Sequence, residues 1–313
     1  MSVASPQICG KILLTGVTGQ VGGELAKTLA PLADVIAPTR AELDLSRVGS
    51  IRELIRSVQP RWIVNPAAYT AVDKAESEPE LAYAINAEAV RVIGEEARQI
   101  GAGVIHFSTD YVFDGTSALP YMETDAPNPV SVYGASKLAG EQALAQSGAA
   151  HLIFRTSWVY GAQGKNFLLT ILKLARERDS LRIVADQHGA PTWSRDLAQM
   201  TAHIIQRCER AISTRGSGGL EALADFSGIY HAAGSGETTW HGFASEAVRL
   251  QRESDPETRF AAIEAIATAE YPTPAKRPAN SSLNCDKLTA KLGWSMMDWR
   301  KSLGAVILEL SSA

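Results

Sequence analysis

The stretch that decides the fold reads KILLTGVTGQVGGEL and covers residues 11–25. Its first part, Lys11–Thr15, is a short apolar run that predicts a strand, and Gln20–Leu32 has the apolar spacing of a helix. The turn between them carries glycines at the spacing G-x-x-G-x-x-G, which lets main-chain N–H groups approach a phosphate at the helix N-terminus. The stretch therefore predicts a dinucleotide site, and the alternative is a tight turn packed with small residues. The predicted cofactor contacts in this turn are Gly16, Thr18, Gly19, Gln20, Val21 and Gly22.

Short apolar runs and helical patterns continue to alternate through the first half of the chain. Strands are predicted at Asp34–Ala37, Trp62–Asn65, Gly103–Ser108 and Leu152–Thr156, and helices at Ile51–Val58, Glu78–Ile100 and Val132–Gln146. Such alternation predicts parallel βαβ units, hence an α/β fold with a Rossmann-type doubly wound parallel sheet. Apolar residues at nearly every strand position fit a sheet that is covered on both faces. Ser77 and Glu80 have the spacing of a capping box at the start of the long helix.

The second half is less regular and predicts a smaller C-terminal α/β substrate domain. Helices are predicted at Asn166–Arg176, Arg195–Arg210 and His241–Arg252, a strand at Gly228–Ala232, a surface loop at Thr214–Gly219 and an ordered, proline-containing loop at Tyr271–Asn284. We expect an NAD(P)-binding domain over residues 1–161, with 192–232 crossing back to it. Residues 162–191 and 233–313 then form the substrate-binding part.

Composition excludes several classes of protein. The 313 residues suffice for a sizeable core, and a formal net charge of -4 argues against a nucleic-acid surface. The three cysteines are too few and too widely spaced for a disulfide framework or a metal site. No apolar run reaches the roughly 18 residues that a membrane span needs. We therefore expect a cytoplasmic enzyme with a small-molecule substrate, no membrane partner and no metal ligands.

The end of the second predicted strand bears on the choice of cofactor. An NAD site often has an acidic residue about 20 residues after the glycine turn, but here the chain carries Arg40. An arginine can grip the 2′-phosphate of NADPH with two hydrogen bonds, so we expect NADPH, with NADH as the alternative. Asp44 and Leu45 are placed to contact the adenine. The alternatives are a solvated charge for Arg40 and a helix N-cap near Ser46 for Asp44.

A tyrosine and a lysine four residues apart predict the catalytic centre. Tyr133 and Lys137 share one face of a helix, and a nearby ammonium favours the phenolate and so lowers the pKa of a tyrosine. Such a pair suits carbonyl reduction, in which a proton must reach the oxygen. Thr109, with Ser108 as second choice, follows a buried strand and can hydrogen-bond that oxygen. Each feature has a structural alternative, namely a surface pair or a turn residue, but together they are specific.

Several strings beyond these motifs resemble one family. They are NPAAYTAVDKAE at 65–76, STDYVFDG at 108–115, VYGASK at 132–137, RTSWVYG at 155–161, DQHGAPT at 186–192, and YPTP at 271–274 with Arg277-Pro278. With the glycine turn, the sequence is similar to the extended short-chain dehydrogenases/reductases and, within them, to the dTDP-4-dehydrorhamnose reductase family. The resemblance spans nearly the whole chain.

The resemblance implies reduction of the 4-keto group of a nucleotide-linked sugar, dTDP-4-dehydro-β-L-rhamnose, by NAD(P)H. It implies Thr109, Tyr133 and Lys137 as the catalytic set. The further contacts that it implies are Ala67, Ala68 and Tyr69 for the cofactor, Asp110, Val112 and Trp158 for the sugar, Arg277 for the diphosphate and Asn166 for the nucleotide. For Asn166 a helix cap is the alternative.

Two departures from the family stand out. Pro66 replaces the more usual alanine and stiffens the local backbone. Some members are described as magnesium-linked homodimers with glutamates at the contact, and Glu24 suits such a role, but Arg195 and Arg300 lie where acidic partners would be needed. The Mg²⁺ requirement is therefore left open. Two other functions also stay open: reduction of another nucleotide-linked 4-ketosugar, and a non-catalytic, dinucleotide-binding regulatory subunit.

Overall fold

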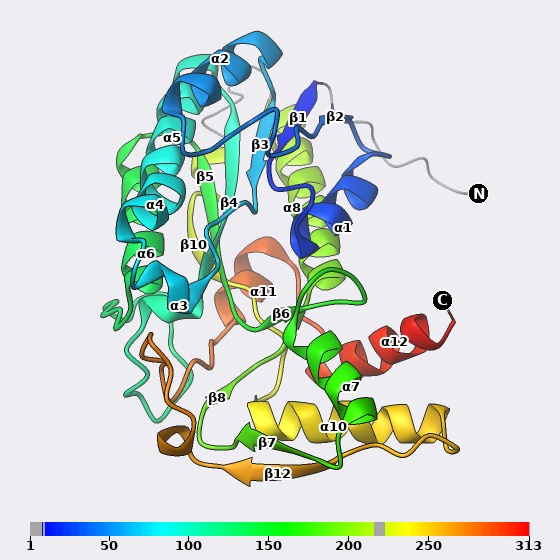
Figure 1. Ribbon diagram of the computed structural model, residues 1–313. Helices are drawn as coiled ribbons and strands as arrows, with labels where there is room; N and C mark the ends of the chain where they lie inside the picture. Colours follow the sequence, from blue (N-terminus) through cyan, green and yellow to red (C-terminus); the bar gives the residue numbers. More distant parts are fainter. Residues whose placement is uncertain (1–7, 9, 216–222, 313) are drawn as a thin grey trace, which may run out of the picture.

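The centre of the molecule is a six-stranded sheet. A computed structural model describes residues 8, 10–215 and 223–312. The strands are β1 (Lys11–Leu14), β2 (Asp34–Ile36), β3 (Trp62–Asn65), β4 (Gly103–Thr109), β5 (His151–Thr156) and β10 (Gly228–His231). They lie in the order β10-β5-β4-β3-β1-β2, and every neighbouring pair is parallel (Figure 1). The predicted doubly wound parallel sheet is confirmed.

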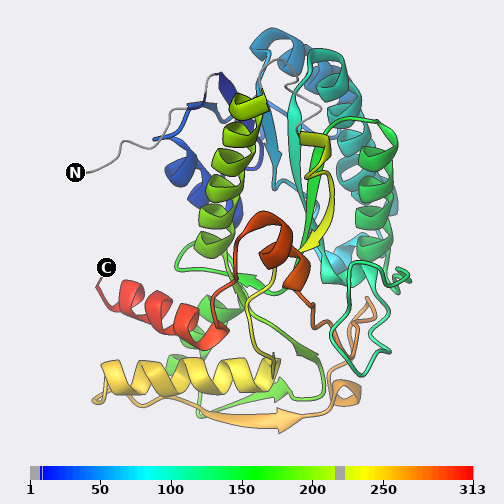
Figure 2. The same cartoon turned by 180° about the vertical axis from the view of Figure 1, so that it is seen from behind.

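Helices cover both faces of this sheet (Figures 1 and 2). One face packs against α2 (Val48–Val58), α5 (Ala89–Ile100) and α6 (Val132–Gln146), and the other against α1 (Gln20–Leu29), α8 (Ser194–Arg215) and α11 (Asp286–Leu292). Alternate strand residues enter the two cores, as Leu13 and Ile63 on one face and Ile12 and Val64 on the other. This burial on both faces explains why the strands are apolar throughout.

The strand order reverses at β1, and this point positions the site. The chain leaves β1 for β2 on one side and then crosses to β3 on the other. Ligands in open α/β sheets bind outside the carboxyl ends of the strands at such a reversal. The turn that follows β1 is the glycine turn.

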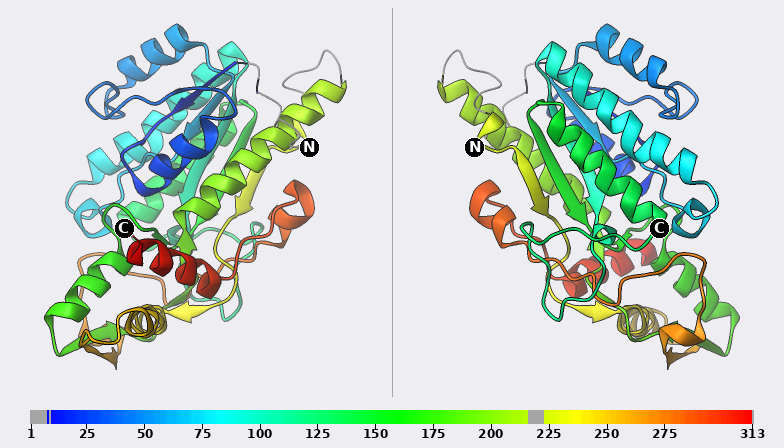
Figure 3. Two further views of the ribbon diagram at one scale, coloured as in Figure 1. Left: turned by 90° about the vertical axis from the view of Figure 1, so that its right-hand side faces the viewer. Right: turned by 90° about the vertical axis from the view of Figure 1, so that its left-hand side faces the viewer.

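The C-terminal part forms a second lobe below the carboxyl edge of the sheet (Figure 3). Its elements include the parallel pair β7 (Ser180–Val184) and β12 (Ala262–Ile266), with α7 (Phe167–Glu177), α10 (Trp240–Ser254) and α12 (Trp299–Ser311). Short strands link this lobe together, namely β6 (Val159–Tyr160) with β9 (Thr192–Trp193), and β8 (His188–Gly189) with β11 (Thr238–Thr239). Two-residue strands carry too little pattern to be predicted from sequence.

The long helix predicted at Glu78–Ile100 is confirmed as one continuous helix from Pro79 to Ile100, with a π-helical turn inside it. The segment contains α4 (Pro79–Tyr83), a π-helical turn (Ala84–Glu88) and α5, after a short α3 (Val72–Ala75). The predicted capping box is wrong: the N-cap is Glu78, without a side-chain cap, and Ser77 Oγ donates to the carbonyl of Lys74. Pro79 occupies the first helical position, where its missing N–H needs no partner.

Other boundaries shift by a few residues. The helix predicted at Arg195–Arg210 runs to Arg215, so the first residues of the predicted loop at 214–219 are helical and the rest lie outside the described residues. α8 packs beside α1, and β10 joins the sheet next to β5. On these contacts we propose the domain division given above, in which 192–232 returns to the cofactor domain. Within the described part of the chain, no helix has the length and apolarity that a bilayer crossing requires.

Candidate functional site

The glycine turn presses the start of α1 against β1. Gly16 has a φ of +61°, a conformation that favours glycine. A Cβ on Gly22 would lie 2.0 Å from the carbonyl oxygen of Gly16, and one on Gly16 would lie 2.9 Å from Cα of Ala67. The N-cap residue, Gly19, gives α1 no side-chain cap. The first N–H groups of α1 are thus left for a ligand, as phosphate binding requires.

A hollow of about 460 Å³ opens in front of this turn. It brings together most of the residues predicted for the cofactor and two predicted for catalysis. These are Gly16, Thr18, Gly19, Gln20, Val21, Gly22, Arg40, Asp44, Leu45, Ala67, Ala68, Ser108, Tyr133 and Lys137. The segments come from the carboxyl ends of β1, β2, β3 and β4, which meet at one edge of the sheet.

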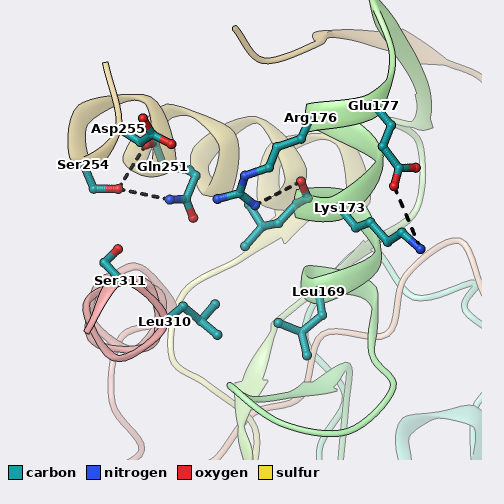
Figure 4. Close-up of a pocket in the computed structure, with 10 residues that line it drawn as sticks. Leu169, Lys173, Arg176, Glu177, Gln251, Ser254, Asp255, Leu310 and Ser311 are labelled. Carbon is teal, nitrogen blue, oxygen red and sulfur yellow. Dashed lines mark hydrogen bonds and ion pairs between the residues drawn. The ribbon is translucent and has the colours of Figure 1, made fainter. Parts of the chain in front are cut away.

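A larger hollow, about 560 Å³, lies in the second lobe between α7, α10 and α12 (Figure 4). Its polar lining groups contact one another, as Gln251 with Ser254 and Lys173 with Glu177. It contains none of the predicted site residues among those that line it. The smaller hollow is therefore the candidate site, because it holds the glycine turn with Tyr133 and Lys137.

Buried hydroxyls in the candidate site fit a polar ligand. Oγ of Ser108 and Oγ1 of Thr156 line the hollow, are buried, and have no hydrogen-bond partner among the described residues. A buried hydroxyl without a partner is costly, and a ligand that carries hydroxyl or amide groups would satisfy it. With the bare glycine turn, these atoms show that the hollow suits a dinucleotide.

The adenine end of the hollow is shaped by an exposed turn. Oδ1 of Asp44 accepts from the N–H and the hydroxyl of Ser46, at 3.0 and 2.8 Å, and these bonds lower the pKa of Asp44. Asp44 is not a helix N-cap, because α2 begins after Arg47. Arg40 also lines the hollow and is exposed, so its guanidinium is free to meet a phosphate from solvent.

Helix α6 brings Tyr133 and Lys137 to the end of β4. Ser131 caps the helix by accepting from the N–H of Gly134 at 3.2 Å. A Cβ at Gly134 would lie 2.1 Å from the carbonyl of Tyr111, and one at Gly140 would lie 2.0 Å from the carbonyl of Asn86. These two glycines let α6 approach the neighbouring backbone closely, which buries the face that carries the tyrosine and the lysine.

The pKa of Tyr133 differs from the expectation. Burial raises the pKa of Tyr133 to about 12, against a hydrogen bond with Thr109 that lowers it. The Nζ of Lys137 donates to the carbonyl of Phe107 at 2.6 Å. Burial is the largest cause of this shift, and the lowering effect expected of Lys137 stays a prediction. Tyr133 is consequently a protonated phenol at neutral pH.

Thr109 and Asp110 form a buried pair next to Tyr133. Oγ1 of Thr109 donates to Oδ1 of Asp110 at 2.8 Å and accepts from the N–H of Tyr111, so Thr109 also caps the turn Asp110–Val112. Burial raises the pKa of Asp110 to about 7, and its Oδ2 has no hydrogen-bond partner among the described residues. The carboxyl group is thus near the midpoint of its titration at neutral pH.

The residues predicted to contact the sugar lie at the seam between the lobes. Trp158 has a φ of +46° and stacks on Trp240 with ring centroids 3.7 Å apart. One face of its ring is therefore covered by the second lobe. Val112 has no exposed surface and packs with Phe113 and Tyr121, so its side chain belongs to a core cluster.

Three further predicted residues tie segments together. Arg277 forms a two-armed ion pair with Asp73, at 2.9 and 2.7 Å, which fixes the proline-containing loop to α3. Asn166 caps α7 by accepting from the N–H of Leu169, which confirms the helix cap named as the alternative. Its Nδ2 also donates to Oε1 of Gln20. Tyr69 donates its hydroxyl to Glu78 at 2.6 Å. Their ligand contacts stay predictions.

Sequence reasoning missed a row of buried polar residues beside Lys137. Thr15, Asn65 and His106 are each at most 2% exposed. Thr15, just after β1, contacts Asn65 on β3, and Asn65 contacts His106 on β4. The signal was present: His106 is a titratable residue within the apolar run Val104–Phe107. A polar side chain in a fully buried strand needs a specific hydrogen-bond partner.

The implied magnesium site does not fit these residues. Nε of Arg195 donates to Oε2 of Glu24 at 2.9 Å, and Nη2 donates to Oε1 of Glu309 at 2.8 Å. Lys27 also pairs with Glu24. The guanidinium holds the position between the two carboxylates and supplies the positive charge, so we derive no step through a metal.

Comparison with known proteins places the chain in a family. Residues 10–312 match the model of the RmlD substrate binding domain. The dTDP-4-dehydrorhamnose reductase of Burkholderia thailandensis is 46% identical over 304 residues, covering 96% of this chain and 99% of the relative. A dTDP-4-dehydrorhamnose reductase crystal structure from Clostridium acetobutylicum has a TM-score of 0.86 and 34% identity, covering 96% of this chain and 99% of that chain.

A second solved structure bears on the same question. The dTDP-4-dehydrorhamnose reductase of Bacillus anthracis, in complex with NADP, has a TM-score of 0.85 and 31% identity, covering 96% of this chain and 100% of that chain. The resemblance noted in the sequence is confirmed by these matches. The chain belongs to the dTDP-4-dehydrorhamnose reductase family.

Proposed function

We propose that this protein uses NADPH to reduce the 4-keto group of dTDP-4-dehydro-β-L-rhamnose to dTDP-L-rhamnose. The observation that carries the proposal is the meeting of the glycine turn, Tyr133 and Lys137 in one hollow at the carboxyl edge of the sheet. The family membership and the NADP complex of the Bacillus anthracis relative support it.

The residues of the hollow have separable tasks in holding the cofactor. The bare N-terminus of α1 suits the pyrophosphate, and the unpartnered hydroxyl of Ser108 suits a polar group farther in. Arg40, at the exposed end, favours NADPH over NADH through the 2′-phosphate. When bound, the nicotinamide supplies hydride to the carbonyl carbon of the sugar.

Tyr133 supplies the proton in this proposal. Its raised pKa keeps the phenol protonated, so it can donate to the ketone oxygen as negative charge develops there. Thr109, which is hydrogen-bonded to Tyr133, offers a hydroxyl at the same place. The Lys137 ammonium, on the same face of α6, stabilises the phenolate that remains after proton donation.

The substrate would lie at the seam between the lobes. Trp158, which stacks on Trp240, is the proposed contact for the sugar, and Asp110 offers a buried carboxyl. Arg277 is the proposed diphosphate partner, although it must then share its guanidinium between the ligand and Asp73. A homodimer and a cytoplasmic location complete the proposal, and light scattering and cell fractionation test them.

The test combines the purified protein with NADPH and enzymatically generated dTDP-4-dehydro-β-L-rhamnose. We expect NADPH absorbance to fall in step with the formation of dTDP-L-rhamnose, identified by chromatography and NMR. Oxidation of NADPH with a different 4-ketosugar only would assign another substrate. Tight NADPH binding without turnover of any ketosugar would favour the regulatory function instead.

A further inference from the structure

A row of buried polar side chains crosses the sheet beneath the glycine turn and ends at Lys137. Oγ1 of Thr15 lies 2.5 Å from Oδ1 of Asn65, and Nδ2 of Asn65 lies 3.1 Å from Nδ1 of His106. Nε2 of His106 lies 3.3 Å from Nζ of Lys137. The sheet register pairs Asn65 directly with His106, so the row is fixed by the backbone of β3 and β4.

Lys137 needs this row because its ammonium is almost completely buried. Lys137 is 1% exposed, and burial lowers its pKa to about 8, against Glu141, which favours the charged form. A buried ammonium must be given acceptors in place of water. The structure gives it the carbonyl of Phe107 at 2.6 Å and the imidazole of His106.

The imidazole can accept only in one tautomer. Burial, together with the Lys137 charge, holds the pKa of His106 well below its usual range, so the ring is neutral and has one donor and one acceptor nitrogen. Nε2 accepts from Lys137 only when the proton is on Nδ1, which then needs an acceptor of its own. The neighbour of Nδ1 is the side-chain amide of Asn65.

Asn65 and Thr15 can supply the matching arrangement. Rotating the Asn65 amide by 180° exchanges its nitrogen and oxygen and moves no other atom. The oxygen then accepts from Nδ1–H of His106, and the nitrogen donates to the hydroxyl of Thr15, which can serve as donor or acceptor. In this arrangement the imidazole of His106 accepts from Lys137 and donates to Asn65, and Lys137 remains charged.

We infer that His106, held in its Nδ1–H tautomer by Asn65, is a positioning residue that keeps the Lys137 ammonium charged and fixed beside Tyr133. The inference deepens the proposed function and rests on it for the role of Lys137 in turnover. The ionisable groups that face Lys137 are Tyr133 and Glu141 along α6 and His106 on β4; Glu141 is held by a buried ion pair with Arg155 at 2.7 Å.

The test is the pH dependence of kcat/KM between pH 6 and 10. His106→Leu removes the acceptor, so the pKa of Lys137 falls further and the ammonium is lost at lower pH. We expect the alkaline limb to move down by about one to two pH units in this variant. His106→Gln carries an amide oxygen that can accept, and we expect its limb to return close to that of the wild type.

Thermal unfolding shows whether each variant is folded before its pH profile of kcat/KM is interpreted. A rate that is lower at every pH, with the alkaline limb unmoved in His106→Leu, would overturn the inference and leave His106 as a packing residue. A limb shifted equally in both variants would overturn it as well, because the Gln side chain keeps the acceptor.

A second measurement does not depend on turnover. Two-bond ¹H–¹⁵N spectra of ¹⁵N-histidine-labelled protein report the tautomer of each of the six histidines, and His106→Gln assigns the signal. We expect a neutral Nδ1–H ring at His106, and an Nε2–H ring would overturn the inference. A wild type that binds NADPH and reduces no ketosugar would refute the proposed function, while the spectrum would still decide the tautomer.

Discussion

At the scale of single residues, burial decides the chemistry of the site. Lys137 and Asp110 are almost completely buried and Tyr133 is partly buried, and each has a pKa displaced toward its neutral form. The phenol stays protonated, and the ammonium and the carboxylate come within reach of neutral pH. The same side chains exposed to solvent would not have these shifted pKa values.

The first prediction concerns the proton donor. We expect Tyr133→Phe to lower kcat by about 10²- to 10⁴-fold, because the phenyl ring cannot donate a proton to the ketone oxygen. Steady-state kinetics measure the loss, and NADPH titration checks that the cofactor still binds. Tyr83→Phe, at a surface tyrosine that is 41% exposed, is the matched control and should retain wild-type rates. Equal activity of both variants would refute the assignment of Tyr133.

The second prediction concerns the choice of cofactor. We expect Arg40→Ala to raise KM for NADPH by about tenfold and to leave KM for NADH nearly unchanged, because only NADPH has the 2′-phosphate. Arg47→Ala is the control, since Arg47 lies near the same Asp44 carboxylate, at 3.9 Å, but is 80% exposed and outside the lining of the hollow. An equal rise in KM for NADPH and for NADH would show that Arg40 does not bind the 2′-phosphate.

At the scale of elements, glycines set how closely helices approach the backbone around the site. Gly22 places α1 on the turn after β1, and Gly134 and Gly140 place α6 on its neighbours. In each case a Cβ would stand about 2 Å from a carbonyl oxygen, and that oxygen belongs to rigid backbone. The helices that carry the cofactor turn and the Tyr133 face are therefore positioned by backbone contact.

The third prediction tests this contact at the glycine turn. In Gly22→Ala the new methyl group would lie 2.0 Å from the carbonyl of Gly16, so α1 must move and its N–H groups lose their alignment. We expect NADPH affinity to fall by about 10²-fold in a fluorescence titration. Gly49→Ala, in α2 with open space around it, is the control and should keep full affinity. Unchanged binding in Gly22→Ala would show that the turn adapts.

At the scale of the whole molecule, an ion-pair triad joins the two lobes. Arg195 on α8 bonds Glu24 on α1 and Glu309 on α12, so the helix of the cofactor turn is linked to the C-terminal helix. The three groups are only partly buried, which limits the stability they contribute. Their main consequence is that both carboxylates already have a cation beside them.

The fourth prediction follows from this neutralisation. We expect treatment with EDTA, followed by gel filtration, to leave the rate of NADPH oxidation with ketosugar unchanged. A guanidinium that already occupies the place between Glu24 and Glu309 leaves little negative charge to attract a divalent cation. Loss of activity that Mg²⁺ restores would contradict this and would require a metal site elsewhere.

Local sequence patterns determined a large part of this protein. The glycine spacing after β1, the apolar strands and the Tyr133–Lys137 spacing depend on residues close together in the chain, and β3 and α6 have the predicted boundaries. The parallel sheet follows from the alternation of such segments, because parallel strands need a helical crossover. These features require no knowledge of distant contacts.

Only the tertiary structure decided the properties that depend on contacts between distant segments. It placed a π-helical turn within the helix predicted at Glu78–Ile100, covered Trp158 with Trp240, and joined Arg277 to Asp73. It also raised the pKa of Tyr133 and placed His106 beside Lys137, 31 residues away in the chain. Burial and hydrogen bonding depend on which segments pack together, and residue spacing along the chain does not contain that information.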